Sequence, residues 1–136
     1  MIVVDAGVLI GAADADDKHH EACSRLFNER GREFIVPATV VVEVCWTLAS
    51  HVSAAVEAEF LDSIAEGELR VEDLDRDDYA RASELVKIYA DFPLGAVDAS
   101  VVAVAERLGI TEVATVDHRH FNALRPRHVE HFVLLP

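Results

Sequence analysis

Residues 93–109 read PLGAVDASVVAVAERLG and form an apolar helical pattern with one acid at its entrance. The larger apolar side chains recur at helical spacing: Val97, Val101, Val104 and Leu108. Alanines and valines fill the positions between them, so almost no face is left for water. Gly109 supplies a residue that tolerates the left-handed turn at which a helix ends. The stretch therefore predicts a buried helix with one acid, Asp98, in its first turn, where free backbone N–H groups favour a carboxylate.

The length and composition of the chain fit a single domain, residues 1–136. Its hydrophobic share of 51% is that of a globular protein, and no uncharged apolar run approaches the roughly 18 residues that span a bilayer. The first residues, MIVVD, lack the basic segment of a signal peptide. Cys23 and Cys45 lie in apolar helical patterns, which favours free thiols in a reducing compartment. We therefore expect a cytoplasmic domain with no membrane role.

The formal net charge is −13, from 25 acidic and 12 basic residues. Such a surplus repels phosphate backbones at long range, so charge alone counts against nucleic acid as a partner. It favours a basic partner protein or bound cations.

Short β-branched segments alternate with helical patterns along the chain. We expect strands at 2–4, 34–36, 69–74, 112–117 and 131–135. We expect helices at 6–13, from the acidic cluster at 14–17 to about 30, at 39–50, at 53–66, at 75–92 and at 96–108, with a His-rich loop after residue 117. This alternation predicts a parallel sheet with helices on both faces and the strand at 69–74 near an edge. Ligands bind such folds beyond the carboxyl ends of the strands, where the strand order reverses.

The apolar spacing also predicts which side chains face the core. In the helix at 75–92 we expect Tyr79, Ala82, Val86 and Tyr89 to point inward and Arg81 to point outward. In the helix at 39–50 the apolar residues, Trp46 among them, leave one polar stripe, which consists of Thr39, Glu43, Thr47 and Ser50.

Four acids interrupt apolar runs: Asp5, Glu43, Asp98 and Asp117. An ionised carboxylate in such surroundings needs a partner, and the chain's two lysines, Lys18 and Lys87, lie in helix-surface patterns. A divalent ion is the natural partner, and oxygen ligands without a Cys/His pattern suit Mg²⁺ or Mn²⁺.

Each acid also has a purely structural interpretation. Asp5 and Asp98 can cap helices, Glu43 can belong to a solvated stripe, and Asp117 can form a turn. The histidines that follow it, His118 and His120, are expected to be surface residues rather than metal ligands.

The motifs around these acids resemble those of PIN domains, specifically the VapC-type toxins of bacterial toxin–antitoxin pairs. The resemblance covers nearly the whole chain and rests on four stretches: VDAGVLI with Asp5, VPATVVVE with Glu43, LGAVDAS with Asp98 and TVDHRHF with Asp117. Their order and spacing agree with the family. Ala6-Gly7 departs from it, because the family usually carries Thr, Ser or Asn after the first acid, and this leaves a hydroxyl near the metal unaccounted for.

The resemblance implies a PIN-like three-layer α/β/α sandwich with a short, mainly parallel sheet. It implies a Mg²⁺- or Mn²⁺-dependent endoribonuclease that cuts structured RNA of the tRNA or rRNA class. Asp5, Glu43, Asp98 and Asp117 would be its catalytic, metal-binding residues, with Thr115 and Arg119 as substrate contacts. Arg119, Arg125 and Arg127 would form a local basic rim for phosphate.

The resemblance also implies partners. A cognate antitoxin would place a basic C-terminal segment over the active site and carry the DNA-binding part of the complex, so that this chain meets DNA only through it. We further expect a homodimer.

Two other functions remain to be weighed. A receiver domain of two-component signalling needs a lysine after its last strands, but Lys87 is the last lysine and precedes Asp98. A PIN-fold binding module that has lost its chemistry is the second alternative, and the four acids argue against it. Metal titration followed by an RNA cleavage assay separates these functions.

Overall fold

The computed structural model describes residues 1–136, which form a five-stranded sheet and seven α-helices. The strands are β1 (Ile2–Val4), β2 (Phe34–Pro37), β3 (Arg70–Glu72), β4 (Glu112–Ala114) and β5 (Val133–Leu135). The helices are α1 (Ala6–Ala13), α2 (His20–Arg30), α3 (Ala38–His51), α4 (Ala54–Ala65), α5 (Arg76–Ile88), α6 (Ala96–Leu108) and α7 (His118–Ala123), and a short 3-10 turn covers Gly31–Glu33.

All neighbouring strands are parallel, in the order β3-β2-β1-β4-β5. The chain moves outward from β1 to β3 in one direction and then returns to β4 and β5 on the other side of β1. The strand order therefore reverses between β1 and β4, which is where ligands bind in open α/β folds.

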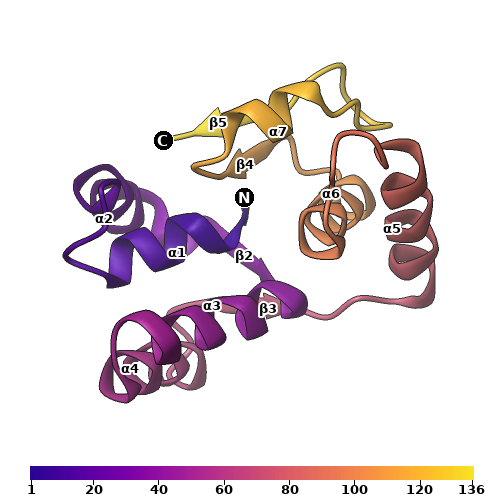
Figure 1. Cartoon of the computed structure of the whole chain (residues 1–136). Helices are drawn as coiled ribbons and strands as arrows, with labels where there is room; N and C mark the ends of the chain where they lie inside the picture. The colour runs from indigo at the N-terminus through magenta and orange to yellow at the C-terminus, as the bar shows by residue number, and fades with distance from the viewer.

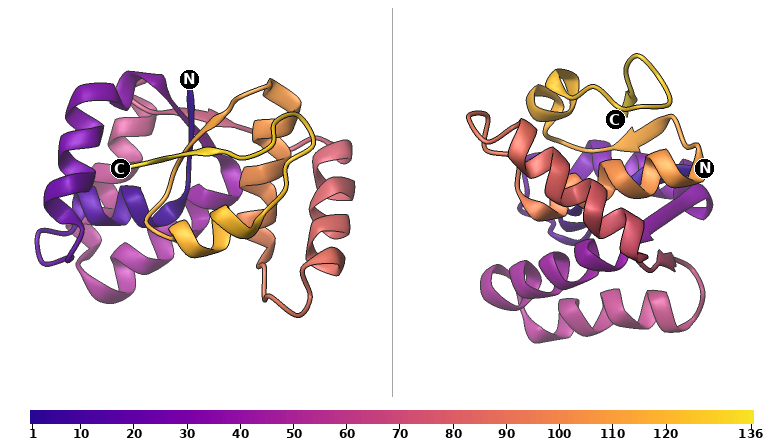
Figure 2. Two further views of the ribbon diagram at one scale, coloured as in Figure 1. Left: turned by 90° about the horizontal axis from the view of Figure 1, so that it is seen from above. Right: turned by 90° about the vertical axis from the view of Figure 1, so that its right-hand side faces the viewer.

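The helices form two groups on either side of the sheet. In Figure 1, α1 to α4 lie to the left of and below the strands, and the α5–α6 pair lies to their right. The left view of Figure 2 shows the same separation. Right-handed crossovers that run in one direction from β1 to β3, and then in the opposite direction from β3 to β5, require this arrangement. The predicted three-layer α/β/α sandwich with a parallel sheet is confirmed.

Helix α6 is the buried helix that the sequence predicts. Residues 99–105 are all buried, and most are fully inaccessible. Gly109 ends the helix with φ 68°, in the left-handed region, and its N–H bonds to carbonyls of the last turn. The α6 helix therefore holds its N-terminal acid on a fixed support.

The inward face predicted for α5 is only half correct: Ala82 is buried and Tyr89 packs against the core, but the other two residues point outward. Tyr79 and Val86 are 62% and 37% exposed, and Arg81, expected at the surface, has a side chain only 10% exposed. The reason is that α5 packs on a face of α6 that carries charge: Arg81 pairs with Glu106 at 2.8 Å. Ion pairing across the two helices, rather than apolar spacing, sets the orientation of α5.

Several boundaries also differ from the expected ones. Helix α2 begins at His20 because carboxylates of the preceding acidic cluster accept local backbone N–H bonds that form turns instead. Helix α5 ends at Ile88, short of residue 92, and β4 stops at Ala114. The expected His-rich loop is helix α7.

The position of β3, the state of the cysteines and the lengths of the helices also bear on the sequence predictions. Strand β3 lies at a sheet edge, as predicted. Cys23 and Cys45 are free thiols, also as predicted. None of the helices has both the length and the hydropathy needed to cross a membrane.

Candidate functional site

The acids singled out in the sequence come from the carboxyl edge of the sheet and the helices around it. Asp5 follows β1 directly, and its backbone N–H extends the ladder to Ala114 of β4 at 2.8 Å. Asp117 follows β4 after a short extension. Asp98 lies in the first turn of α6 and Glu43 in the second turn of α3. All of them surround the point where the strand order reverses.

The protonation behaviour of the acids shows that their charges act on one another. Burial raises the pKa of Asp5 to about 6, and the charges of Asp98 and Asp117 raise it further. Burial and then the charge of Asp5 raise the pKa of Glu43. The pKa of Asp98 is raised by burial, by Glu43 and by Asp117. The fold therefore brings the four acids into one electrostatic cluster, as the sequence predicts.

No lysine or arginine pairs with any of these four carboxylates. The ion-paired arginines all bind other acids: Arg25, Arg30, Arg70, Arg81, Arg107 and Arg127. The negative charge of the cluster is thus left without a lysine or arginine counterpart from the chain, and Asp5 carries its part of that charge in a buried place, where it is costly.

A chain of hydrogen bonds fixes Asp5. Its Oδ1 accepts from the N–H of Ala6 at 2.8 Å, and its Oδ2 accepts from the hydroxyl of Thr115 at 3.1 Å. The Thr115 hydroxyl in turn accepts from the N–H of Asp117 at 3.0 Å. Thr115 has no exposed surface, so it orients the two acids and does not contact substrate, contrary to our expectation.

The same region explains the unusual Ala6-Gly7. A Cβ at Gly7 would stand 2.5 Å from Cγ2 of Val116, so the missing side chain gives room to the extension that follows β4. The hydroxyl near the first acid is supplied by Thr115 instead of by the next residue in the sequence.

His120 lies at the edge of the cluster, and the prediction that it is a plain surface residue is wrong. Asp117 caps α7 by accepting from the backbone N–H of His120 at 3.1 Å, and Nδ1 of the ring lies 2.6 Å from the other Asp117 oxygen. The imidazole packs against Phe92 with ring centroids 4.8 Å apart. The sequence holds one signal for this contact: His120 is three residues after Asp117, and this spacing brings the two side chains together if residues 118–123 are helical.

The expected basic rim loses one of its three charges, because Arg127 pairs with Glu84. Arg125 is exposed and in no ion pair, but one nitrogen of its guanidinium donates to the carbonyls of Asn122 and Leu124. Arg119 is exposed and forms no side-chain hydrogen bond or ion pair, so it has the most freedom to meet a phosphate.

The donors fit a hard divalent cation by their chemistry. In the present arrangement no three His, Cys, Asp or Glu side chains converge closely enough to coordinate one ion. The cluster nevertheless offers only carboxylate oxygens, which Mg²⁺ and Mn²⁺ prefer, and its charge lacks any other compensation. Asp5 and Asp98, the most deeply placed, are the best candidates for direct ligands.

Comparison with known proteins gives concordant matches. The family model for the PIN domain matches residues 2–125. The chain is 28% identical, over 135 residues, to Ribonuclease VapC26 of Mycobacterium tuberculosis (strain ATCC 25618 / H37Rv), covering 99% of this chain and 100% of that protein.

Solved structures share the fold. VapC20 of Mycobacterium tuberculosis, described as a sarcin-ricin loop cleaving toxin, superposes with a TM-score of 0.77 at 21% identity, over 83% of this chain and 87% of that one. VapBC2 from Rickettsia felis, bound to a DNA fragment from its promoter, gives a TM-score of 0.64 at 18% identity, over 98% and 97% of the two chains.

Proposed function

Since the chain belongs to the PIN-domain family, as its motifs predicted, we propose that it is a metal-dependent endoribonuclease and the toxin of a toxin–antitoxin pair. One observation carries the proposal: four carboxylates from separate elements gather around the carboxyl edge of a parallel sheet, close enough to shift one another's pKa, with no lysine or arginine among them. The relationship to VapC26, a ribonuclease, supports the same activity.

In this proposal Asp5 and Asp98 hold Mg²⁺ or Mn²⁺, with Glu43 and Asp117 as further ligands, directly or through water. A bound divalent ion would lower the pKa of water and neutralise charge on the phosphodiester. Ala6 and Thr115 orient the Asp5 carboxylate by hydrogen bonds to both of its oxygens. Because the pKa of Asp5 is about 6, this ligand must lose a proton to bind metal, so affinity should rise with pH up to and somewhat beyond that value.

The substrate in this proposal is a structured RNA of the tRNA or rRNA class. A net charge of −13 disfavours non-specific binding to RNA, so in this proposal binding depends on cation-bridged phosphate contacts and on local basic groups. Arg119, exposed and unpaired beside Asp117, suits a phosphate contact.

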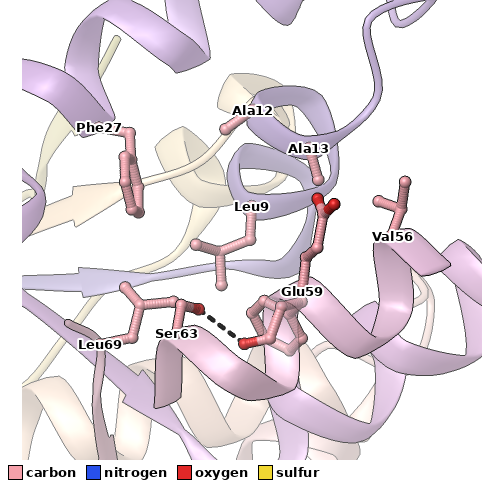
Figure 3. A pocket seen from close by; sticks show the side chains of 9 residues that line it. Leu9, Ala12, Ala13, Phe27, Val56, Glu59, Ser63 and Leu69 are labelled. Carbon is pink, nitrogen blue, oxygen red and sulfur yellow. Dashed lines mark hydrogen bonds between the residues drawn. The ribbon is translucent and has the colours of Figure 1, made fainter. Parts of the chain in front are cut away.

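An apolar groove supports the antitoxin part of the proposal. It lies between α1, α2 and α4, encloses about 200 Å³, and is lined mainly by apolar side chains, among them Leu9, Phe27 and Phe60 (Figure 3). Glu59 stands at its edge, and the acidic surplus of the chain favours a basic occupant. Leu9 is one turn along α1 from Asp5, so a partner segment in the groove can continue over the acids.

Helix α3 supports a homodimer. Val42 and Trp46, one turn apart on either side of Glu43, are 70% and 67% exposed, which is unusual for side chains of this size. A second copy of the chain would cover them close to the acids. In this proposal DNA is contacted only by the antitoxin.

The test is cleavage of total cellular RNA by the pure protein with Mn²⁺, with Mg²⁺ and with chelator, beside the Asp98→Asn variant. We expect cleavage by the wild type with metal and none in the other arms. Equal cleavage in chelator would contradict the metal mechanism. RNA binding without cleavage would favour the catalytically silent PIN-fold module.

A further inference from the structure

A pair of hydroxyls, one buried and one half-buried, joins the two helices that carry Glu43 and Asp98. Thr39 of α3 and Ser100 of α6 are hydrogen-bonded through their side chains, although they are 61 positions apart in the sequence. Ser100 is 1% exposed. This is a direct polar link between α3 and α6, in a contact that is otherwise made mainly of valine, leucine and alanine.

The direction of this hydrogen bond follows from the bonds around it. The Ser100 hydroxyl donates its one proton to the carbonyl of Val97 at 2.6 Å. It can therefore only accept from Thr39, whose hydroxyl is the donor. The α6 backbone thus fixes the Ser100 oxygen, and the Ser100 oxygen fixes the rotation of Thr39 and of the α3 turn that carries it.

The pair lies next to the acids along both helices. Glu43 is four residues after Thr39 and so lies on the same face of α3, one turn further on. Ser100 is two residues after Asp98 in the first turns of α6. Fixing the two hydroxyls together therefore fixes the approach of the two carboxylates.

The link between the two hydroxyls opposes an electrostatic repulsion between α3 and α6. Glu43 and Asp98 raise each other's energy by like-charge repulsion, since the charge of Glu43 is the strongest that acts on Asp98. Repulsion pushes α3 and α6 apart when no cation lies between the acids. Apolar packing is not directional and allows the helices to slide, whereas a buried hydroxyl that loses its partner pays the full cost of its desolvation.

We propose that Thr39 and Ser100 are positioning residues, which hold the Glu43 and Asp98 carboxylates at the separation that metal binding needs. The proposal rests on the proposed function. Neither residue touches metal or substrate; both act through the acids that follow or precede them on their helices.

The experiment compares Thr39→Val, Ser100→Ala and the double variant with the wild type. Mn²⁺ binding is measured by calorimetry on the RNA-free protein, and kcat and KM are measured on a cleavable RNA. Loss of groups that orient metal ligands typically lowers metal affinity 10- to 100-fold, so we expect at least about a tenfold loss in each single variant. Because each variant removes the same Thr39–Ser100 bond, the double variant should lose no more than Ser100→Ala, which also removes the bond to Val97. The loss should appear in kcat at fixed Mn²⁺, with the KM for RNA unchanged.

Two controls separate positioning from stability. Thr39→Ser keeps the hydroxyl and should retain wild-type Mn²⁺ affinity even if it melts lower. Ser63→Ala on α4 removes a hydroxyl that bonds only to the carbonyl of Phe60, at 2.6 Å, and to none of the four acids, so it should leave Mn²⁺ affinity unchanged (Figure 3).

The outcomes are distinct. Wild-type Mn²⁺ affinity and kcat in Thr39→Val and Ser100→Ala, with only a lower melting temperature, would overturn the proposal, as would losses that add in the double variant. A wild-type chain that binds no Mn²⁺ and cleaves no RNA would overturn the proposed function, and this inference with it.

Discussion

Replacing Asp5 with asparagine should stabilise the metal-free protein at neutral and alkaline pH, although it removes a group central to the site. The pKa of Asp5 is raised from 3.8 to about 6, chiefly by burial and then by Asp98. Because the folded pKa is the higher one, the folded state binds the proton more tightly, and stability falls as pH rises from about 4 to about 6. Above that range the ionised carboxylate costs about 3 kcal/mol relative to its protonated form.

Asparagine resembles the protonated side chain in shape and can still accept from the N–H of Ala6. In the wild type the Thr115 hydroxyl donates to the second Asp5 oxygen, but asparagine has an NH₂ group at this position. The Thr115 proton therefore loses its acceptor, which costs about 1 kcal/mol. The net gain at about pH 8 should therefore be about 2 kcal/mol. Between about pH 5 and about pH 8 the wild type should lose roughly 1.4 kcal/mol more than the variant.

The assay is urea unfolding of both proteins in chelator at a series of pH values. Asp78→Asn is the matched control, because Asp78 is equally buried but pairs with Arg107 at 2.9 Å. Removing that partner should destabilise the protein by about 2 kcal/mol or more at pH 8. The contrary result is that Asp5→Asn also destabilises the protein at pH 8 and that its stability changes with pH in parallel with the wild type. In that case the ionised Asp5 carboxylate does not destabilise the folded state, and the explanation of its raised pKa by burial and repulsion is wrong.

Three further predictions test other parts of the site. Mg²⁺ at a hundredfold excess over its Kd should add about 2.7 kcal/mol to the unfolding free energy of the wild type and much less to that of Asp98→Asn; equal gains would exclude Asp98 as a ligand. Gly7→Ala should lower both the melting temperature and kcat, because its Cβ would stand 2.5 Å from Val116, and a second change, Val116→Ala, should restore them; a double variant no better than the single one would contradict this steric explanation. Arg119→Ala should reduce the salt dependence of RNA binding by roughly one charge without changing Mn²⁺ affinity, and an unchanged slope would rule out a phosphate contact.

The elements of the fold could be predicted where the signals are local. The α6 helix is defined by a continuous apolar pattern and by Gly109, and β3 by its alternation and by the glycine before it. The orientation of α5 could not be predicted in this way. Arg81 is buried because Glu106, 25 positions later, meets it there, and no window of sequence around Arg81 contains that information.

The same distinction holds for the site. Its acids could be recognised because a carboxylate inside an apolar run needs a reason to be there. The groups that orient them could not, since each acts across the fold: Thr115 reaches Asp5 over 110 positions, and Thr39 reaches Ser100 over 61. A hydroxyl in a helix or strand carries no local sign of which partner it will meet.

The distribution of charge connects stability with function in this chain. Its arginines neutralise acids of the surface and of the α5–α6 contact, such as Glu106 and Asp78, and so stabilise the scaffold. None is placed among the four site acids, so the folded chain retains a concentrated negative charge that a proton on Asp5 or a cation from solution would relieve. Under the proposed function, metal binding would be favoured by relief of repulsion as well as by coordination, and the scaffold would have to hold the acids together before the ion binds. The buried α6 helix, the Thr115 bonds to Asp5 and the Thr39–Ser100 link are the parts of the structure that meet this requirement.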